Sequence, residues 1–134
     1  MDGKAVAEQW GLGPHPEGGY YRETYRSPLS VTPTGWPGPR PLATAILYLL
    51  PAHERSAWHR VRGEELWLWQ GGGPLRLSVG DARHLVGPDR RAGQELQVLV
   101  PAGAWQAATP ATDEWSLVAC VVAPGFDFAD FELQ

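Results

Sequence analysis

Two side chains that can exchange protons stand five residues apart in the middle of the chain, His59 and Glu64, within the stretch SAWHRVRGEELWLWQG. An imidazole changes charge near neutral pH, and a carboxylate beside it can fix its tautomer and stabilise the imidazolium. In the functional interpretation the second ring nitrogen of His59 stays free for a substrate. In the structural interpretation the two side chains hydrogen-bond to each other and hold two strands together. Both interpretations are open at this point.

Which carboxylate faces inward depends on the register of the strand. Successive side chains of a strand point to opposite faces, so a shift of one residue puts Glu65 inside in place of Glu64. With Glu64 inside, Trp67 and Trp69 lie on the outer face and pack between sheets or at a dimer interface. With Glu65 inside, the same two tryptophans line the pocket.

The segments that position these groups are short and strand-like. Sixteen glycines and 13 prolines interrupt the 134 residues, which argues against helices of ordinary length. One short helix is expected near the N-terminus, where Val6 and Trp10 share a face before Gly11. The other apolar runs have the length of strands and are separated by turn residues: YYRETYRS, ATAILYLLP, ELWLWQG, LRLSV, ELQVLVP and WSLVACVVAP. The pattern predicts an all-β sandwich or small barrel formed by one domain, residues 1–134.

Composition and charge argue against several classes of partner. The formal net charge is -4, whereas nucleic-acid binding needs clustered positive charge. No segment approaches the roughly 20 apolar residues of a membrane span, and the first residues lack the apolar stretch of a signal peptide. We therefore expect a cytoplasmic protein that binds neither nucleic acid nor membranes. The arginines that do cluster are attributed mainly to loop solvation, with anion binding as a minor alternative: Arg55, Arg60, Arg62, Arg83, Arg90 and Arg91.

The stretches SAWHRVRGEELWLWQG and VPAGAWQAA resemble the two motifs of the cupin superfamily, whose members are double-stranded β-helix (jelly-roll) barrels. The first family motif has two histidines separated by one residue, then a glutamate and a glycine. The second has a proline, a glycine and a histidine. His59 stands at the second histidine and Glu64 at the glutamate, so this spacing favours Glu64 as the inward carboxylate. Ala57 replaces the first histidine, and Gln106 replaces the last.

These replacements bear on the metal that the resemblance implies. Catalytic metals in cupins rest on three histidines and a carboxylate, a set that can hold iron, manganese, nickel or zinc. Ala57 has no lone pair to offer, and the amide oxygen of Gln106 is a weak ligand compared with imidazole. We therefore expect no bound metal and no other cofactor. A metal-dependent enzyme with an atypical ligand set is the alternative.

Three blocks in the same order are similar to an uncharacterised branch of the cupins called cupin family 5: HPEGGYYRETYRS, HRVRGEELWLWQGG and APGFDFADFEL. The similarity extends from about His15 to Leu133 and implies a homodimer but no particular reaction. The large number of tryptophans and phenylalanines favours the dimer as well, because monomers rarely expose extended apolar patches. The phenylalanines of the last block are expected to cover the barrel edge or the dimer contact, with Asp127, Asp130 and Glu132 facing water.

The stretch EGGYYRETY also resembles a strand of the sugar-nucleotide epimerases that share this barrel. Those enzymes place a catalytic histidine after a small and an apolar residue, as Ala57, Trp58 and His59 do here. The resemblance implies ligand contacts from Tyr21, Arg22, Glu23 and Tyr25, and we expect Tyr48 and Gln106 to contact the ligand as well. By alternation, Tyr21, Glu23 and Tyr25 share one face and Arg22 lies on the other. The alternative is an edge strand swapped onto a partner subunit, with its polar groups solvated.

Three functions compete on these grounds. The first is a metal-independent epimerase or isomerase that uses His59 on a small polar ligand, sugar-like or nucleotide-sugar-like. Such an enzyme needs a second acid, for which Tyr21, Tyr25 and Tyr48 are candidates. The second is a non-catalytic module that binds a small molecule, and the third is the metal-dependent enzyme. Whether the protein is an enzyme stays open.

Overall fold

The computed structural model describes residues 2–134, which form short strands, one α-helix and two 3-10 turns. The helix is α1 (Gly3–Gln9), and the turns are η1 (Arg90–Ala92) and η2 (Phe128–Asp130). The strands in chain order are β1 (Gly13–Pro14), β2 (Tyr20–Arg26), β3 (Ser30–Val31), β4 (Arg40–Pro41), β5 (Thr44–Leu50), β6 (Ser56–Arg60), β7 (Glu64–Gly72), β8 (Leu75–Val79), β9 (Ala82–Val86), β10 (Gln94–Glu95), β11 (Gln97–Val100), β12 (Gln106–Pro110), β13 (Ser116–Ala123) and β14 (Glu132–Leu133).

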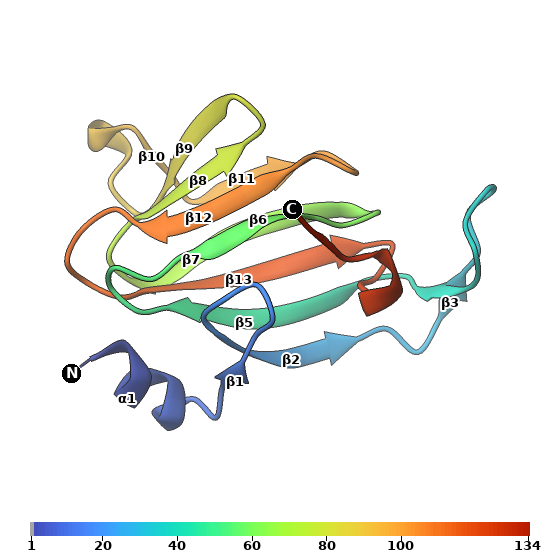
Figure 1. Ribbon diagram of the computed structural model, residues 1–134, viewed down its shortest axis with the longest axis horizontal. Helices are drawn as coiled ribbons and strands as arrows, with labels where there is room; N and C mark the ends of the chain where they lie inside the picture. Colours follow the sequence, from blue (N-terminus) through green and yellow to red (C-terminus); the bar gives the residue numbers. More distant parts are fainter. Residues whose placement is uncertain (1) are drawn as a thin grey trace.

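Two six-stranded sheets form the body of the molecule. The first has the order β1-β2-β5-β13-β7-β11, and the second has the order β10-β9-β8-β12-β6-β14. Neighbouring strands are antiparallel except β9 and β10, and strands distant in sequence pair throughout, as β13 does with β5 and β7. Figure 1 shows the two layers facing each other, with β3 and β4 projecting at the end opposite α1. The predicted all-β jelly-roll barrel with a short N-terminal helix is confirmed.

The helix α1 covers one end of the first sheet. It begins where the Asp2 side chain accepts a hydrogen bond from the Ala5 backbone N–H at 2.8 Å, an N-cap contact. Val6 and Ala7 are buried against Leu49, whereas Trp10 is half exposed. At seven residues this helix is too short to cross a membrane, and residues 2–134 contain no longer one.

The space between the sheets is filled at one end. Buried side chains from both sheets meet there: Tyr48, Leu50, Trp67, Leu75, Leu77, Val86, Val98, Val100, Ala108 and Val118. Trp67 is 1 % exposed and packs edge-on against Tyr48, with 6.0 Å between ring centroids. Of the two registers considered for β7, the structure adopts the one with Glu65 and Trp67 inside, and Trp67 packs in the core.

The C-terminal segment is tied to the barrel by charge and by pairing. Arg40 donates two hydrogen bonds of 2.8 Å to the Asp130 carboxylate, and Arg62 Nε donates a third of 3.0 Å. These bonds, above all those from Arg40, hold the pKa of Asp130 below its ordinary value. Asp130 is buried, so the prediction that it faces water is wrong. After it, β14 pairs with β6 at the edge of the second sheet.

Candidate functional site

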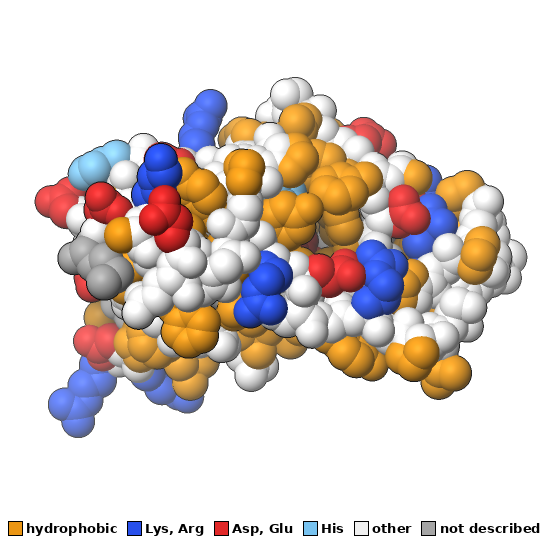
Figure 2. Space-filling view, turned by 90° about the horizontal axis from the view of Figure 1, so that it is seen from below, with side chains coloured by type: hydrophobic (Ala, Val, Ile, Leu, Met, Phe, Trp, Pro, Cys, Tyr) orange, Lys and Arg blue, Asp and Glu red, His pale blue; other side chains and the backbone are white. Residues whose placement is uncertain are grey.

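The other end of the barrel interior is hollow. A cavity of about 420 Å³ lies between the two sheets and the C-terminal segment. Figure 2 shows a hollow framed by hydrophobic side chains on the corresponding face, with acidic and basic side chains side by side at its edge. The cavity is lined by His15, Glu17, Tyr21, Glu23, Arg26, Thr44, Ile46, His59, Val61, Glu65, Cys120, Val122, Phe126, Asp127, Phe128 and Phe131.

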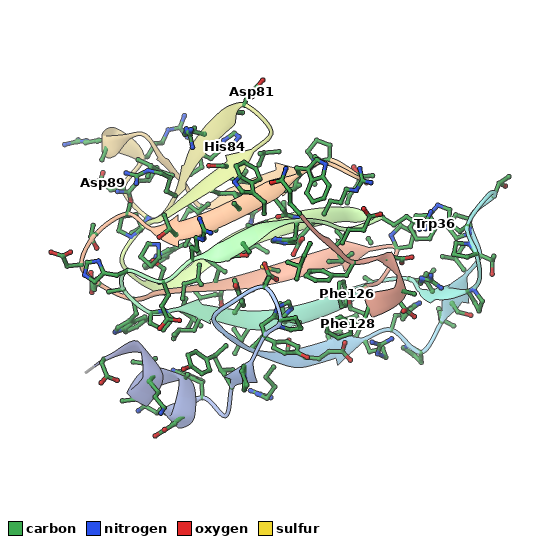
Figure 3. The ribbon with its side chains drawn as sticks, viewed as in Figure 1. Trp36, Asp81, His84, Asp89, Phe126 and Phe128 are labelled. Atoms are coloured by element: carbon green, nitrogen blue, oxygen red, sulfur yellow. The ribbon has the colours of Figure 1, made fainter. Side chains whose placement is uncertain are left out.

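Aromatic rings from the C-terminal segment form one side of the cavity mouth. Phe126 and Phe128 meet edge-on with 4.8 Å between centroids, and Figure 3 shows both in the segment that follows β13. Phe131 reaches deeper and lies 5.6 Å from the His59 ring. On the strand side, Arg26 donates two hydrogen bonds of 2.9 Å to the Glu23 carboxylate. The mouth thus offers apolar ring faces beside a polar, charged edge.

The floor of the cavity carries a buried carboxyl and imidazole in direct contact. Glu17 Oε2 lies 3.0 Å from His59 Nε2, and the Ser56 hydroxyl donates to the same oxygen. A bulge in β6 brings these groups together, because Gln106 of β12 pairs with His59 but Ala108 pairs with Ser56. Ser56 and His59 therefore both point inward, at 0 % and 1 % exposure.

One proton is shared between Glu17 and His59. His59 Nδ1 lies 2.7 Å from the Ala57 carbonyl oxygen, which can only accept, so Nδ1 carries a hydrogen. Nε2 of the neutral ring then has a lone pair, and its contact with Glu17 requires a proton on one partner. Burial raises the pKa of Glu17 to about 8, and the Glu65 carboxylate adds to the rise. Burial also lowers the pKa of His59. At neutral pH the proton therefore resides on Glu17, which donates to His59.

This arrangement corrects the prediction for His59. Its two ring nitrogens are both engaged, one by the Ala57 carbonyl and one by Glu17. No ring nitrogen is left free for a substrate, and the partner carboxylate is Glu17 rather than Glu64. Glu17 lines the cavity and has a second oxygen, Oε1, which lies 3.3 Å from His15 Nδ1.

His15 adds a second neutral imidazole to the floor. Its Nδ1 accepts the Glu17 backbone N–H at 3.0 Å, so the ring proton sits on Nε2. Burial, with a smaller repulsion from His59, lowers the pKa of His15 to about 4. Among residues 2–134, Nε2 of His15 has no hydrogen-bond partner, although the ring is packed edge-on against Tyr21 at 4.6 Å. This N–H is a donor available to a molecule in the cavity.

A tight loop carries His15 and Glu17 back into the barrel. His15 N–H donates to the Gly19 carbonyl at 3.0 Å, and Gly18 N–H donates to the His15 carbonyl at 3.0 Å. Gly18 and Gly19 have φ angles of 110° and 74°, which residues with a side chain rarely adopt. The Glu17 carbonyl then accepts from Ala57 N–H at 2.7 Å, which fixes the loop on β6. The paired glycines are thus the sequence signal for this loop, but they do not reveal where it folds.

A second buried carboxyl is Glu65, and it replaces Glu64 as the inward acid of β7. Glu65 is 7 % exposed and lines the cavity, whereas Glu64 is exposed on the opposite face. The prediction for Glu64 is wrong because the motif spacing gave a register one residue off. Gln106 Nε2 donates to Glu65 Oε1 at 2.8 Å, and Gln106 Oε1 accepts the Trp67 indole N–H at 2.9 Å. Burial raises the pKa of Glu65 to about 7.

A second bulge, in β2, separates the predicted ligand contacts of that strand into residues that line the cavity and residues that do not. Tyr21 and Glu23 line the cavity as expected, but Tyr25 does not. Glu23 pairs with Ile46 of β5 and Tyr25 with Ala45, so one extra residue on β2 reverses the alternation after Glu23. Arg26 takes the inward place, and Tyr25 lies exposed on the outer face. Arg22 is exposed on the outer face, away from the cavity.

Two further predicted ligand contacts are core residues. The Tyr48 hydroxyl donates to the Gly18 carbonyl at 2.5 Å, and the ring is 1 % exposed, so it cannot reach a molecule in the cavity. Gln106 is fully buried behind Glu65, with its amide nitrogen and oxygen both hydrogen-bonded. Of the three tyrosines proposed as a second acid, only Tyr21 lines the cavity.

The donor set does not fit the metal that the motif resemblance implies. The Gln106 oxygen is turned toward the Trp67 indole, its nitrogen has no lone pair, and Ala57 has no donor atom. Within residues 2–134, no three His, Cys, Asp or Glu side chains are grouped so as to hold a metal ion. That the protein works without a metal stays a prediction for elemental analysis.

The chain is similar to known proteins along nearly its whole length. Residues 4–134 match the family described as Cupin superfamily (DUF985). The chain is 33 % identical over 143 residues to the uncharacterized protein YML079W of Saccharomyces cerevisiae, covering 93 % of this chain and 71 % of that one.

Two solved structures are similar along the whole chain. A hypothetical protein from Leishmania major superposes with a TM-score of 0.91 at 33 % identity, covering 100 % of this chain and 88 % of that one. Protein SO0799 from Shewanella oneidensis superposes with a TM-score of 0.89 at 34 % identity, covering 100 % and 85 %. These names state no activity, so the chemistry of the site has to be argued from its own residues.

Proposed function

Since the chain belongs to the cupin superfamily (DUF985), we propose that its barrel cavity binds a small polar molecule and exchanges a proton with it through Glu17. The observation that carries the proposal is the contact of 3.0 Å between Glu17 Oε2 and His59 Nε2 on the cavity floor, which requires a proton on one of the two atoms. A protonated carboxyl in a closed site is a general acid ready at neutral pH. His59 orients the Glu17 carboxyl and the Ala57 carbonyl orients His59, and a bound ligand would take the proton in place of His59 Nε2.

The two buried carboxyls suit an epimerase or isomerase. Both reactions remove a proton from carbon next to a carbonyl and return one, so they need a base and an acid in the same site. The pKa of Glu65 near 7 leaves a large share of it ionised at neutral pH, while Glu17, with a pKa near 8, is mostly protonated. Glu65 is the base and Glu17 the acid in this scheme. Tyr21, which lines the same cavity, is an alternative second acid.

The shape of the cavity favours a sugar-like ligand. A volume of about 420 Å³ lies at the lower end of small-molecule pockets and suits one ring with its substituents. The faces of Phe126 and Phe131 can cover the C–H side of a sugar ring, and the His15 Nε2–H can donate to a hydroxyl or carbonyl oxygen. The Glu23–Arg26 pair at the mouth is placed for a polar extension, such as the phosphates of a nucleotide sugar.

Deuterium uptake tests this function across many compounds at once, so the substrate need not be chosen beforehand. The protein is incubated in D₂O with a panel of aldoses, ketoses, sugar phosphates and nucleotide-linked keto sugars, and each compound is then weighed by mass spectrometry. An epimerase or isomerase adds one mass unit to its substrate, and Glu17→Gln and Glu65→Gln should each slow that uptake by about 10²-fold or more. Glu64→Gln is the matched control, because its carboxylate neighbours Glu65 in sequence but faces solvent.

The alternative function, binding without chemistry, gives a different outcome in the same experiment. In that case a compound from the panel raises the melting temperature of the wild type but gains no deuterium. Native mass spectrometry of freshly purified protein adds an independent check, because a tightly held ligand would copurify. Both functions would be contradicted for this class of ligand if no compound changed the melting temperature, none gained deuterium, and native mass spectrometry found only the mass of the protein.

We also propose that the protein is a homodimer built on the outer face of the first sheet. Leu66 and Leu68 of β7 and Leu99 of β11 are cross-strand neighbours there, and Leu99 is 51 % exposed. Tyr25, turned outward by the bulge in β2, is 52 % exposed on the same sheet. Light scattering should give twice the chain mass of 14.7 kDa. Leu99→Glu should shift the protein toward monomer, and a wild type that is already monomeric would reject the proposal.

A further inference from the structure

A second recess lies on the outer face of the second sheet, on the other side of β6 from the cavity. It holds about 180 Å³ and is lined by Arg55, Ser56, Trp58, Arg76, Ser78, Arg83, Ala107, Ala108 and Thr109. We call it the arginine groove. The centre of the groove is recessed because two small residues, Ser78 of β8 and Ala107 of β12, pair there side by side. Longer side chains rise around this recessed floor.

Three of these longer side chains are arginines without a carboxylate partner. Across residues 2–134, the arginines in ion pairs are Arg26, Arg40, Arg60 and Arg62, and none of them lines the groove. Arg55, Arg76 and Arg83 do line it, and all three are exposed. No acidic side chain contributes to the lining. Asp81, at the tip of the β8–β9 hairpin, points away from the sheet (Figure 3).

The cross-strand pairing keeps this charge concentrated. Arg83 of β9 is directly opposite Ser78, and Arg76 lies two residues before Ser78 on β8. Side chains in this diagonal relation are within reach of each other, and like charges on neighbouring strands destabilise a sheet. In a chain of net charge -4, such a local excess of positive charge is stabilised best by a bound anion.

The hydrogen-bonding groups of the groove suit an oxyanion. Arg83 Nη1 donates to Ser78 Oγ at 2.9 Å, which directs that guanidinium toward the floor and leaves the Ser78 hydroxyl hydrogen free to donate. A guanidinium presents paired N–H groups that match two oxygens of a phosphate or carboxylate. Thr109 is not part of this set, because its hydroxyl already donates to the Glu54 carbonyl at 2.9 Å.

We propose that the arginine groove binds a phosphate group, free or as the head of a small phosphorylated molecule, through Arg76, Arg83 and Ser78, with Arg55 closing one side. The volume of about 180 Å³ suits a group of that size and is too small for a drug-sized ligand. The proposal is independent of the reaction in the barrel cavity, because none of the three arginines lines that cavity.

Isothermal titration with inorganic phosphate and with pyrophosphate, at about 20 mM ionic strength and pH 7, tests the proposal. The wild type should bind both, pyrophosphate more tightly, with affinities that fall as sodium chloride is added. The double variant Arg76→Ala/Arg83→Ala should lose at least about tenfold in affinity, since each charge-assisted bond contributes strongly. The double variant Arg76→Lys/Arg83→Lys keeps the charge but not the paired N–H groups, so its affinity should lie between the two.

Arg91→Ala is the matched control, because Arg91 is an exposed arginine on η1 outside the groove. Its affinity for pyrophosphate should equal that of the wild type. Equal affinities of the wild type and the alanine double variant, both folded by circular dichroism, would overturn the proposal. So would the absence of any binding up to about 10 mM pyrophosphate, or amide shifts in the NMR spectrum that leave the residues lining the groove unchanged.

Discussion

The two ends of the barrel interior are lined by the same strands, yet one is filled and the other is hollow. On β7, Trp67 closes the filled end and Glu65 lines the cavity. On β13, Val118 belongs to the packed core, and Val122 faces the cavity four residues later. At the filled end, hydrophobic side chains from the two sheets meet. At the hollow end, a polar floor and the C-terminal segment keep the sheets' inner faces apart.

The hollow end contributes less to the stability of the fold than a packed core would. The hollow end buries two carboxyls and two imidazoles that a packed core could have replaced with hydrophobic residues. Each is hydrogen-bonded, and their pKa values are displaced in opposite directions, the acids upward and the imidazoles downward. Groups with perturbed pKa values cluster at functional sites, where such shifts match an acid or base to its task. On the proposed function, the filled end holds the fold and the hollow end carries the chemistry.

The largest effect expected from this comparison is the loss of a side chain at the filled end. Trp67→Ala should lower the free energy of unfolding by about 3–5 kcal/mol, since it leaves a large cavity and an unpaired Gln106 oxygen. Phe128→Ala at the cavity mouth, where the ring is 50 % exposed, should cost less than about 1 kcal/mol. Urea unfolding of both variants measures the contrast. Similar costs for the two would mean that the ends do not differ as described.

A smaller effect is expected from the pH dependence of stability. Glu17 and Glu65 have pKa values raised from 4.5 to about 8 and about 7, so the folded state holds protons that the unfolded state has lost. Stability therefore falls as pH rises through this range. His15 and His59, with lowered pKa values, act in the opposite direction, and their effect fades as pH rises through 6.5, where unfolded histidine loses its proton. Between pH 7 and 8 the two carboxyls outweigh the two histidines, and each full proton lost on unfolding contributes about 1.4 kcal/mol per pH unit.

Thermal unfolding followed by circular dichroism checks this slope. The melting temperature of the wild type should fall from pH 6.5 to pH 8, and Glu17→Gln should flatten most of the fall because glutamine has no proton to lose. A wild type whose melting temperature stays level or rises over that window would show that the two carboxyls are not protonated in the folded protein.

The sequence predicted the barrel but not the details that assemble the site. Turn residues and apolar runs of strand length were sufficient to predict an all-β fold. The motif resemblance was sufficient to predict that the fold is a jelly-roll barrel. Alternation then failed at the bulge in β2, because one extra residue there reverses the direction of every side chain after it. Tyr25 left the cavity and Arg26 entered it for that reason. No local pattern marks such a bulge in advance.

The acid at the centre of the site was missed for a different reason. Glu17 lies in a loop and meets His59 only when the chain has folded, 42 positions later. A search for a partner near His59 in sequence finds Glu64, which the observed register turns outward. The spacing of residues predicts which side chains meet within a strand or between neighbouring strands. It does not predict which loop folds into the barrel.

The smallest effect expected is the one that separates the two glutamates at the start of β7. Glu65→Gln should stabilise the protein by about 1 kcal/mol at pH 8, because it removes a buried carboxylate that is charged there. Glu64→Gln, on the exposed face, should change stability by less than about 0.5 kcal/mol at any pH. Urea unfolding at pH 6 and pH 8 makes the comparison. Equal effects of the two substitutions would contradict the assigned register of β7.

The protonation of Glu17 tests the proposed chemistry most directly, and carbon NMR of protein labelled with ¹³C at the glutamate carboxyl can measure it. The Glu17 signal is identified by its loss in Glu17→Gln and followed from pH 4 to pH 10. We predict a midpoint near 8, well above that of an ordinary glutamate, and a changed midpoint in His59→Gln. A Glu17 carboxyl that titrates near 4.5 would contradict this, because His59 would then face a permanent carboxylate and no acid would stand ready in the cavity.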